Sequence, residues 1–273
     1  METRVLTEAD FEEGAELARS VGWKDSVDDW RVISSCATCL GLRENGRLIA
    51  TVALCDFGGV VSVAKMLVHA ECRGRGLAKR LLAEALALRK RADAVQMLIA
   101  TAEGYPVYER AGFKSVEKIH FINGTASGLR ESKAVELGTE ALPLAVALDA
   151  RSVGCERGPM IAARWQRAVA RFGVMRGGEL VAFGLRLKQG PGSLVGPLVA
   201  RELGDAVEVL HALLPRDGSF VRVDVPERQT AFRAEVLRLG LNEGTPRTEM
   251  TLGGAALPGE RAMRFCPAAL AYG

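Results

Sequence analysis

A six-residue motif that occurs twice places the strongest constraint on how this chain can fold. Residues 73–78 (RGRGLA) and residues 201–206 (RELGDA) share the pattern R-x-x-G-x-A, and each follows an apolar run and precedes an amphipathic segment. The two motifs are 128 residues apart (201 minus 73), and the same offset separates Gly112 from Gly240. Because two independent segments share one register, the sequence predicts two tandem copies of one fold.

Length and composition agree with two ordinary domains. The chain has 273 residues, of which 48% are hydrophobic and 25% charged, and a typical domain has about 150 residues. A net charge of +3 is too close to neutral for an extended surface that binds nucleic acid or an anionic membrane. The sequence also lacks the run of about 18 apolar residues that a membrane helix needs. We therefore expect neither nucleic acid nor a membrane as a partner.

The N-terminal segment and the cysteines predict an intracellular environment. The segment METRVLTEADFEEG carries acids early and lacks the apolar core of a signal peptide, so we expect a cytoplasmic protein. The six cysteines are too few and too irregularly spaced for a disulfide framework. Cys36 and Cys39 form a C-x-x-C pair, but no second pair of ligands completes a zinc site, so no metal is predicted.

Hydrophobic patterns in the first copy predict alternating strands and helices. Apolar stretches on both sides of Asn45-Gly46 predict a β-hairpin, and a β-branched apolar run predicts a buried strand before the first motif. An amphipathic helix, a further buried strand and a short helix ended by Gly112 follow. The expected elements are a hairpin at 41–55, a strand at 60–69, a helix at 77–88, a strand at 95–101 and a helix from about 106. This order predicts a mixed α/β fold.

The turn between the strand and the helix at residues 73–78 has the properties of an anion site. The first N–H groups of a helix have no intrahelical acceptor, and the helix dipole favours negative charge there. Gly74 and Gly76 lack Cβ atoms that would keep a diphosphate from these N–H groups, while Arg73 and Arg75 add positive charge. Many glycine-rich turns exist for backbone reasons alone, so the turn by itself does not decide a function.

A Rossmann dinucleotide site is the obvious alternative for a glycine-rich turn after a strand. Its G-x-G-x-x-G pattern needs a third glycine where this sequence has Lys79. An acid is also expected about 20 residues further on, at the end of the next strand. Asp93 has that spacing but precedes its strand, so we reject this alternative.

Two motifs together resemble those of the GNAT acetyltransferases. Arg73, Gly76 and Ala78 occupy the three positions of that family's R/Q-x-x-G-x-G/A signature, and residues 108–113 (YERAGF) resemble its Y-x-x-x-G-F segment. The resemblance implies a mixed α+β sheet with acetyl-CoA bound in a gap between two diverging strands. It also implies direct transfer of the acetyl group to an amine, with acetyl-CoA as co-substrate.

The resemblance further implies which residues bind and react. Main-chain groups of the strand before the turn would bind the pantetheine arm, and amides of the turn would bind the pyrophosphate. The candidate cofactor-binding residues are Leu67, Val68, Arg73, Gly74, Arg75, Gly76, Leu77, Ala78 and Lys79. Tyr108 occupies the family's general-acid position, although it could instead be only an aromatic anchor, and Tyr105 competes for the role. Glu103 is expected to cap the next helix rather than to accept a proton. The general base is left open among Asp29, Asp56 and Glu71.

The second copy has lost the features of the anion site. Glu202, Leu203 and Asp205 stand where the first copy has Gly74, Arg75 and Leu77, and Val236 stands where it has Tyr108. Negative charges oppose a diphosphate, so we expect one acetyl-CoA site per chain. The segments VGPLVA and VDVP make this half similar to the C-terminal domain of a bacterial GNAT subgroup that includes the YitH-type proteins.

These observations predict two tandem GNAT-type domains, at residues 1–130 and 131–273, with a polar linker at 123–140. The expected function is acetyl-CoA-dependent acetylation of a primary amine on a small molecule or amino-acid-like acceptor. The alternatives are a non-catalytic acetyl-CoA sensor or scaffold, and a protein lysine or N-terminal acetyltransferase. The acidic residues Asp25, Asp28 and Asp29 suit a cationic amine, and a solvated helix face explains them equally well. Two copies in one chain favour a monomer over a homodimer.

Overall fold

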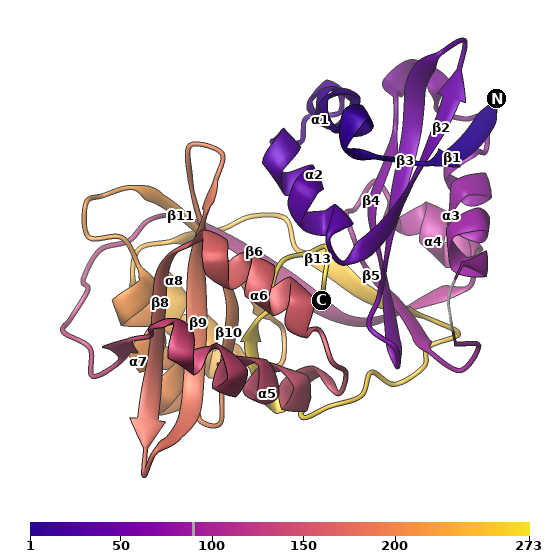
Figure 1. Ribbon diagram of the computed structural model, residues 1–273. Coiled ribbons are helices and arrows are strands. Elements are labelled where there is room, and N and C mark those ends of the chain that lie inside the picture. The colour runs from indigo at the N-terminus through magenta and orange to yellow at the C-terminus, as the bar shows by residue number, and fades with distance from the viewer. Residues whose placement is uncertain (89–90) are drawn as a thin grey trace.

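The computed structural model describes residues 1–88 and 91–273, and it shows two α/β halves joined edge to edge (Figure 1). Its helices are α1 (Phe11–Ser20), α2 (Val27–Ser34), α3 (Leu77–Ala87), α4 (Tyr105–Arg110), α5 (Leu142–Val153), α6 (Gly158–Arg167), α7 (Leu203–Leu213) and α8 (Thr230–Arg238). The strands of the first half are β1 (Glu2–Val5), β2 (Ala37–Glu44), β3 (Arg47–Asp56), β4 (Val60–Val68), β5 (Val95–Ala100) and β6 (Phe113–Thr125). Those that follow are β7 (Val135–Glu136), β8 (Ala168–Arg176), β9 (Glu179–Gln189), β10 (Gly192–Ala200), β11 (Phe220–Pro226), β12 (Asn242–Glu243), β13 (Arg247–Leu252) and β14 (Arg264–Cys266).

The first half is a sheet with helices on both faces, as its hydrophobic pattern predicts. Strands β1, β2, β3 and β4 pair with one another in that order, and each of these pairs is antiparallel. The next pair, β4 and β5, is parallel. Helices α3 and α4 lie on one face and α1 and α2 on the other (Figure 1). Two apolar clusters fill these layers, one with Leu81 and Phe113 on the α3 side, the other with Phe11 and Trp30 on the α1 side. The predicted hairpin, strands and helices of this half are confirmed.

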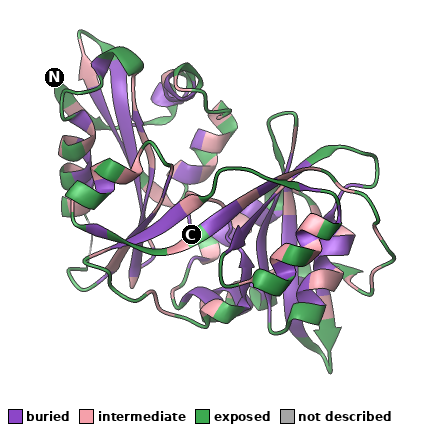
Figure 2. Cartoon of the chain, turned by 180° about the vertical axis from the view of Figure 1, so that it is seen from behind, coloured by how far each residue is buried: buried purple, intermediate pink, exposed green. Residues whose placement is uncertain are grey.

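The two halves exchange strands, which the sequence analysis did not predict. Strand β13 returns from the second half and lies between β5 and β6, where Thr248 pairs with both Ala100 and Lys118. On its other edge, β6 pairs with β11 of the second half, from Ile119 to Thr125. The strands of the described residues therefore belong to one sheet with 14 strands, which continues from one half into the other (Figure 2).

The polar segment at 123–140, expected as an exposed linker, is attached to both halves. Its first three residues belong to β6. Further along, Glu208 of α7 accepts hydrogen bonds from the Ser132 hydroxyl and from the Lys133 N–H, the latter at 2.7 Å. Glu208 also pairs with Arg130 at 2.8 Å. The segment is therefore fixed to the second half by side-chain contacts that its composition does not reveal.

A buried charge network holds the exchanged strand in place. Glu249 of β13 is fully buried and accepts hydrogen bonds from Arg264 of β14 and from Arg261. Arg264 also reaches Glu117 of β6 at 3.0 Å. Burial by itself raises the pKa of Glu249, but the two guanidinium groups outweigh it and hold this pKa at about 2. The network therefore needs an ionised Glu249.

Removing this charge is expected to destabilise the fold in a pH-dependent way. The Glu249→Gln substitution leaves two buried guanidinium groups short of a carboxylate, which costs about 3 kcal/mol at pH 7. Because the folded pKa lies below the unfolded value, the ionised wild-type side chain stabilises the fold above about pH 4.5 and loses this contribution as the pH falls toward 2. Urea unfolding at pH 7 and at pH 3 should show the difference between the two proteins shrinking in acid. An equal difference at both pH values would contradict the assignment.

Over the described ranges, no helix is long and apolar enough to cross a membrane. Within the same residues, no group of three or more His, Cys, Asp and Glu side chains is arranged to hold a metal ion.

Candidate active site

Strands β4 and β5 diverge at the position where the resemblance places the acetyl-CoA gap. Their parallel pairing begins with Val60 and Val95 and ends with Val63 and Leu98. Both strands continue beyond that point, to Val68 and Ala100. Main-chain groups of the last β4 residues, Leu67 and Val68 among them, therefore face a strand that has moved away.

A β-bulge in β4 causes this divergence. Thr51 pairs with Leu67 and Ala53 with Ala64, so two residues of β4, Lys65 and Met66, stand opposite one residue of β3. Lys65 has a φ of 49°, and the Thr51 hydroxyl donates to its carbonyl at 2.9 Å. Because a bulge bends and twists its strand, the outer part of β4 turns away from β5.

The turn after β4 has a backbone that only glycine adopts easily. Gly74 and Gly76 have φ values of 76° and 73°, in the left-handed region. A Cβ atom at either position would meet no protein atom within 4 Å, so the space above the turn is open. Gly76 is the residue that precedes α3, and Leu77 is the first residue of that helix. The turn therefore presents bare backbone at a helix N-terminus.

A row of free amides lines this turn. The Arg73 N–H donates to the Ala70 carbonyl, and the Arg80 N–H donates to the Gly76 carbonyl. The N–H groups of residues 74–79, which lie between them, have no acceptor among the described residues. Adjacent free N–H groups at a helix N-terminus bind phosphate oxygens well. The predicted residues Gly74 to Lys79 are thus brought together as one potential anion site.

The two arginines of the turn have partners of their own. Arg73 forms an ion pair with Glu103, and Arg75 forms a two-point ion pair with Glu44 at 2.6 and 3.0 Å. Both side chains are partly exposed, so these pairs are weak and can rearrange. The expectation that Glu103 caps α4 is wrong, because none of the described side chains caps this helix and Glu103 pairs with Arg73. In the turn before the helix, the Thr101 hydroxyl accepts a hydrogen bond from the Gly104 N–H.

Tyr108 lies on α4, on the same face of the sheet as the glycine turn. Its side chain is 9% exposed and belongs to the apolar cluster that also contains Val63, Leu77 and Leu98. Its ring contacts Phe113 edge-on, with centroids 6.2 Å apart. The hydroxyl has no hydrogen-bond partner in the described part of the chain, and burial raises the pKa of Tyr108. This phenol therefore stays protonated at neutral pH and has a proton to donate.

Tyr105 and the candidate bases are engaged elsewhere. The Tyr105 hydroxyl lies 3.0 Å from Ser115 Oγ and 3.3 Å from a Glu109 oxygen. Asp56 accepts a hydrogen bond from Gly58 N–H in the loop after β3. Asp29 forms a capping box with Ser26 at the start of α2, and the exposed Glu71 lies near Arg47. The structure therefore brings none of these three acids next to Tyr108 through a direct hydrogen bond.

The acids proposed for amine binding also have partners. Asp25 pairs with Lys65, whose ammonium group lies 5.6 Å from the centroid of the Trp30 ring. Asp28 pairs with Arg31 at 2.8 Å. A surface ion pair therefore explains Asp28, and a helix cap explains Asp29. Asp25 differs from both, because its partner Lys65 belongs to the β4 bulge.

In the second half, the equivalent gap is closed by the chain itself. Strands β10 and β11 pair from Ser193 to Val195, and a bulge at Gly196-Pro197 follows. Beyond it, β14 pairs with β10 and contacts β11, so it occupies the gap. The two bulges are 131 residues apart (196 minus 65), so the constant offset of 128 in the sequence does not extend to this strand.

The start of α7 also differs from the start of α3. Eight residues separate β4 from α3, but only Arg201 and Glu202 separate β10 from α7. The side chain of Asp205 is buried in the first turn of α7 and pairs with Arg176 at 2.6 Å. Val236, the counterpart of Tyr108, is fully buried in the core. The second half therefore lacks both the open turn and the phenol.

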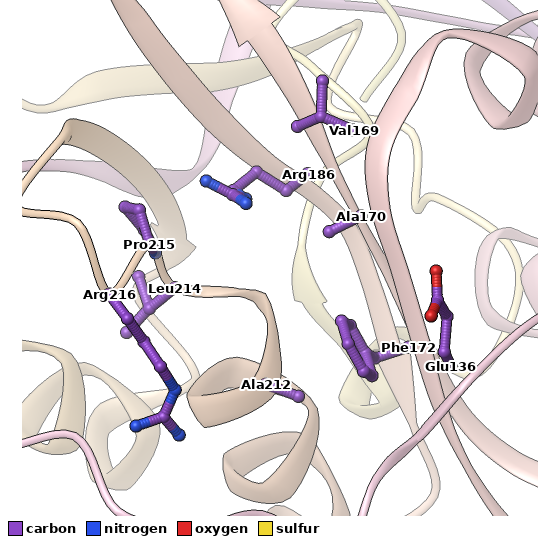
Figure 3. Close-up of a pocket in the computed structure, with 9 residues that line it drawn as sticks. All are labelled: Glu136, Val169, Ala170, Phe172, Arg186, Ala212, Leu214, Pro215 and Arg216. Carbon is purple, nitrogen blue, oxygen red and sulfur yellow. The ribbon is translucent and has the colours of Figure 1, made fainter.

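One cavity of the second half lies away from these features. Its volume is about 380 Å³, and Figure 3 shows Leu214 and Arg216 on one side of it and Phe172 and Glu136 on the other. The cavity lies between β8, β9 and the residues after α7, at the opposite end of that helix from Asp205. It is not part of the proposed acetyl-CoA site.

Comparison with known proteins agrees with this geometry. Two sequence models, both described as acetyltransferase (GNAT) domain, match residues 35–115 and 145–265. The chain is a GNAT acetyltransferase with two tandem GNAT domains. It is 22% identical over 238 residues to the uncharacterized N-acetyltransferase YitH of Bacillus subtilis, a match that covers 83% of each chain.

Solved structures show that the fold is shared over the whole length. A presumed acetyltransferase of Pyrococcus horikoshii matches with a TM-score of 0.81 and 16% identity, covering 100% of this chain and 95% of the other. A tandem GNAT protein from the clavulanic acid biosynthesis pathway matches with a TM-score of 0.64 and 15% identity, covering 94% and 99%. At these identities the likeness concerns the fold alone. Membership of the GNAT family implies acetyl-CoA as the co-substrate.

Proposed function

We propose that this GNAT enzyme transfers the acetyl group of acetyl-CoA to a primary amine on a small, amino-acid-like molecule. The diphosphate would bind the free amides of residues 74–79 beside the Arg73 side chain, and the pantetheine arm would run along the main chain of Leu67 and Val68. The observation that carries this proposal is the meeting of three features at one end of β4. These are the divergence from β5, the row of free amides and the unpartnered Tyr108 hydroxyl.

Direct transfer needs an acid on the side of the departing sulfur. Attack by the neutral amine on the thioester carbon forms a C–N bond and a tetrahedral intermediate, which collapses as the C–S bond breaks. Tyr108 would give its proton to the departing thiolate, and the proton lost by the amine would return to the tyrosinate through water. Atoms and charges then balance, and the products are an amide and free CoA.

A binding measurement tests the single-site part of this proposal. Isothermal titration is expected to give one acetyl-CoA per chain, because β14 fills the second gap and Asp205 lies buried at the start of α7. A stoichiometry of two would contradict it. A screen of amines and amino acids with thiol detection would then identify the acceptor. Tight acetyl-CoA binding with no free CoA from any amine would favour a sensor.

The sheet also supports a monomer. Its outer strands, β1 and β7, have four and two residues. Such short edges offer little backbone for pairing with a second copy. Static light scattering is therefore expected to give the mass of one chain at micromolar concentration, and a mass of two chains would overturn this expectation.

A further inference from the structure

A buried arginine of the second half has no carboxylate in hydrogen-bond contact with it among the described residues. Arg164 on α6 is 5% exposed, and its one hydrogen bond among the described residues runs from Nη2 to the Gly196 carbonyl at 2.8 Å. Its Nε is buried without a partner. An isolated buried charge is costly, and burial lowers the pKa of Arg164 to about 10. An anion that contacts Arg164 directly would offset this cost.

The neighbours of Arg164 carry charges of both signs. Arg157 and Arg222 lie close enough to disfavour its charged form, whereas Asp29 of α2 lies close enough to favour it but forms no hydrogen bond or ion pair with it. Each of these two arginines has its own carboxylate, Asp149 for Arg157 at 2.7 Å and Asp224 for Arg222 at 2.7 Å. Among the described residues, Arg164 is therefore the one guanidinium of this group that no carboxylate contacts directly.

The C-terminal segment places Arg164 near the gap in the first half. The guanidinium carbon lies 5.8 Å from the centroid of the Tyr272 ring. Next to Tyr272, the Ala271 carbonyl accepts a hydrogen bond from Ser62 of β4 at 3.0 Å, and Gly273 lies against the Met97 side chain of β5. Ser62 and Met97 are cross-strand partners, one pair before β4 and β5 diverge.

Tyr272 approaches the gap from the face opposite Tyr108. It belongs to the apolar cluster of α1 and α2, whereas Tyr108 belongs to the cluster of α3 and α4. Its ring is 5% exposed, and its hydroxyl has no hydrogen-bond partner among the residues that the structure describes. An acceptor that enters from the α1 and α2 face would therefore approach the Tyr272 hydroxyl, which has no hydrogen-bond partner among the described residues. It would also approach the Arg164 guanidinium, which no carboxylate contacts directly.

We propose that Arg164 and the Tyr272 hydroxyl bind a carboxylate of the acceptor, so that the substrate is an amino acid or a close analogue. This inference rests on the proposed function, because it names the acceptor of the same reaction. A carboxylate would compensate the unpaired guanidinium charge and accept the phenolic hydrogen bond. The second half would thus contribute specificity to the site in the first half.

Matched pairs of acceptors test the inference. The kcat/KM of the full chain is measured for a panel of amino acids, for their carboxamides and for aminoalkyl phosphates, with thiol detection. We expect the best amino acid to exceed its carboxamide at least 30-fold. Arg164→Gln should reduce this preference at least 10-fold by raising the KM of the amino acid. It should leave the Kd of acetyl-CoA and the rate with the carboxamide unchanged. A phosphate that outperforms every carboxylate would overturn the choice of a carboxylate.

Three further variants separate binding from folding. Arg164→Lys keeps the charge and should retain part of the preference, and Tyr272→Phe should reduce it about fivefold. Arg167→Gln removes the same charge one turn further along α6, where the side chain is 40% exposed, and should change nothing. Equal rates for acids and amides, or a preference that survives Arg164→Gln, would overturn this inference while the proposed function stands. If no amine is acetylated, the proposed function fails, and this inference fails with it.

Discussion

Replacing Gly76 with glutamate is expected to raise the Kd of acetyl-CoA at least 100-fold, or about 2.7 kcal/mol. Two causes act together. The φ of 73° is unfavourable for any side chain, and the new carboxylate would stand in the open space above the free amides. The negative charge would oppose the diphosphate where the helix N-terminus favours it. Isothermal titration of both proteins with acetyl-CoA measures the effect.

Two control variants separate these causes. Gly76→Ala carries the backbone strain without the charge, so it should weaken binding much less than Gly76→Glu. Gly204→Glu places the same charge in the first turn of α7, where the glycine is exposed and its φ is not positive. That variant should bind acetyl-CoA like the wild type. If it weakens binding as strongly as Gly76→Glu, the assignment of the site to the first half is wrong.

Tyr108→Phe is expected to reduce kcat about 100- to 1,000-fold, the usual contribution of a positioned general acid. The substitution removes one oxygen and leaves the ring contact with Phe113 in place, so acetyl-CoA affinity and stability should change little. Steady-state kinetics with a confirmed acceptor, together with titration of acetyl-CoA, measure both effects. An unchanged kcat would show that Tyr108 is only an aromatic anchor.

Tyr105→Phe is the matched control on the same short helix. Its hydroxyl already interacts with Ser115 and Glu109, so its loss should change kcat less than threefold. The pH profile gives a second readout. Because burial raises the pKa of Tyr108, this group should not limit kcat on the alkaline side up to pH 10. A wild-type rate that falls between pH 8 and pH 9 would contradict the assignment.

Local patterns were sufficient for the elements and for the turn. The hairpin at Asn45-Gly46, the strand at 60–68 and the helix from Leu77 follow from periodicity and turn chemistry, which depend on neighbouring residues. By contrast, the ion pairs of Arg73 and Arg75 join residues about 30 positions apart, and spacing does not predict them.

The sequence by itself determined that this protein has two copies of one α/β unit, and that one copy has an open glycine turn. Only the tertiary structure decided how the copies are joined. Strand pairing depends on hydrogen bonds between main-chain groups that are the same in every residue, so no motif marks β13 as a strand of the first half. For the same reason, the sequence did not reveal that β14 closes the second gap. The contact between Arg164 and Tyr272 joins side chains that are far apart in the sequence, so no local pattern marks it.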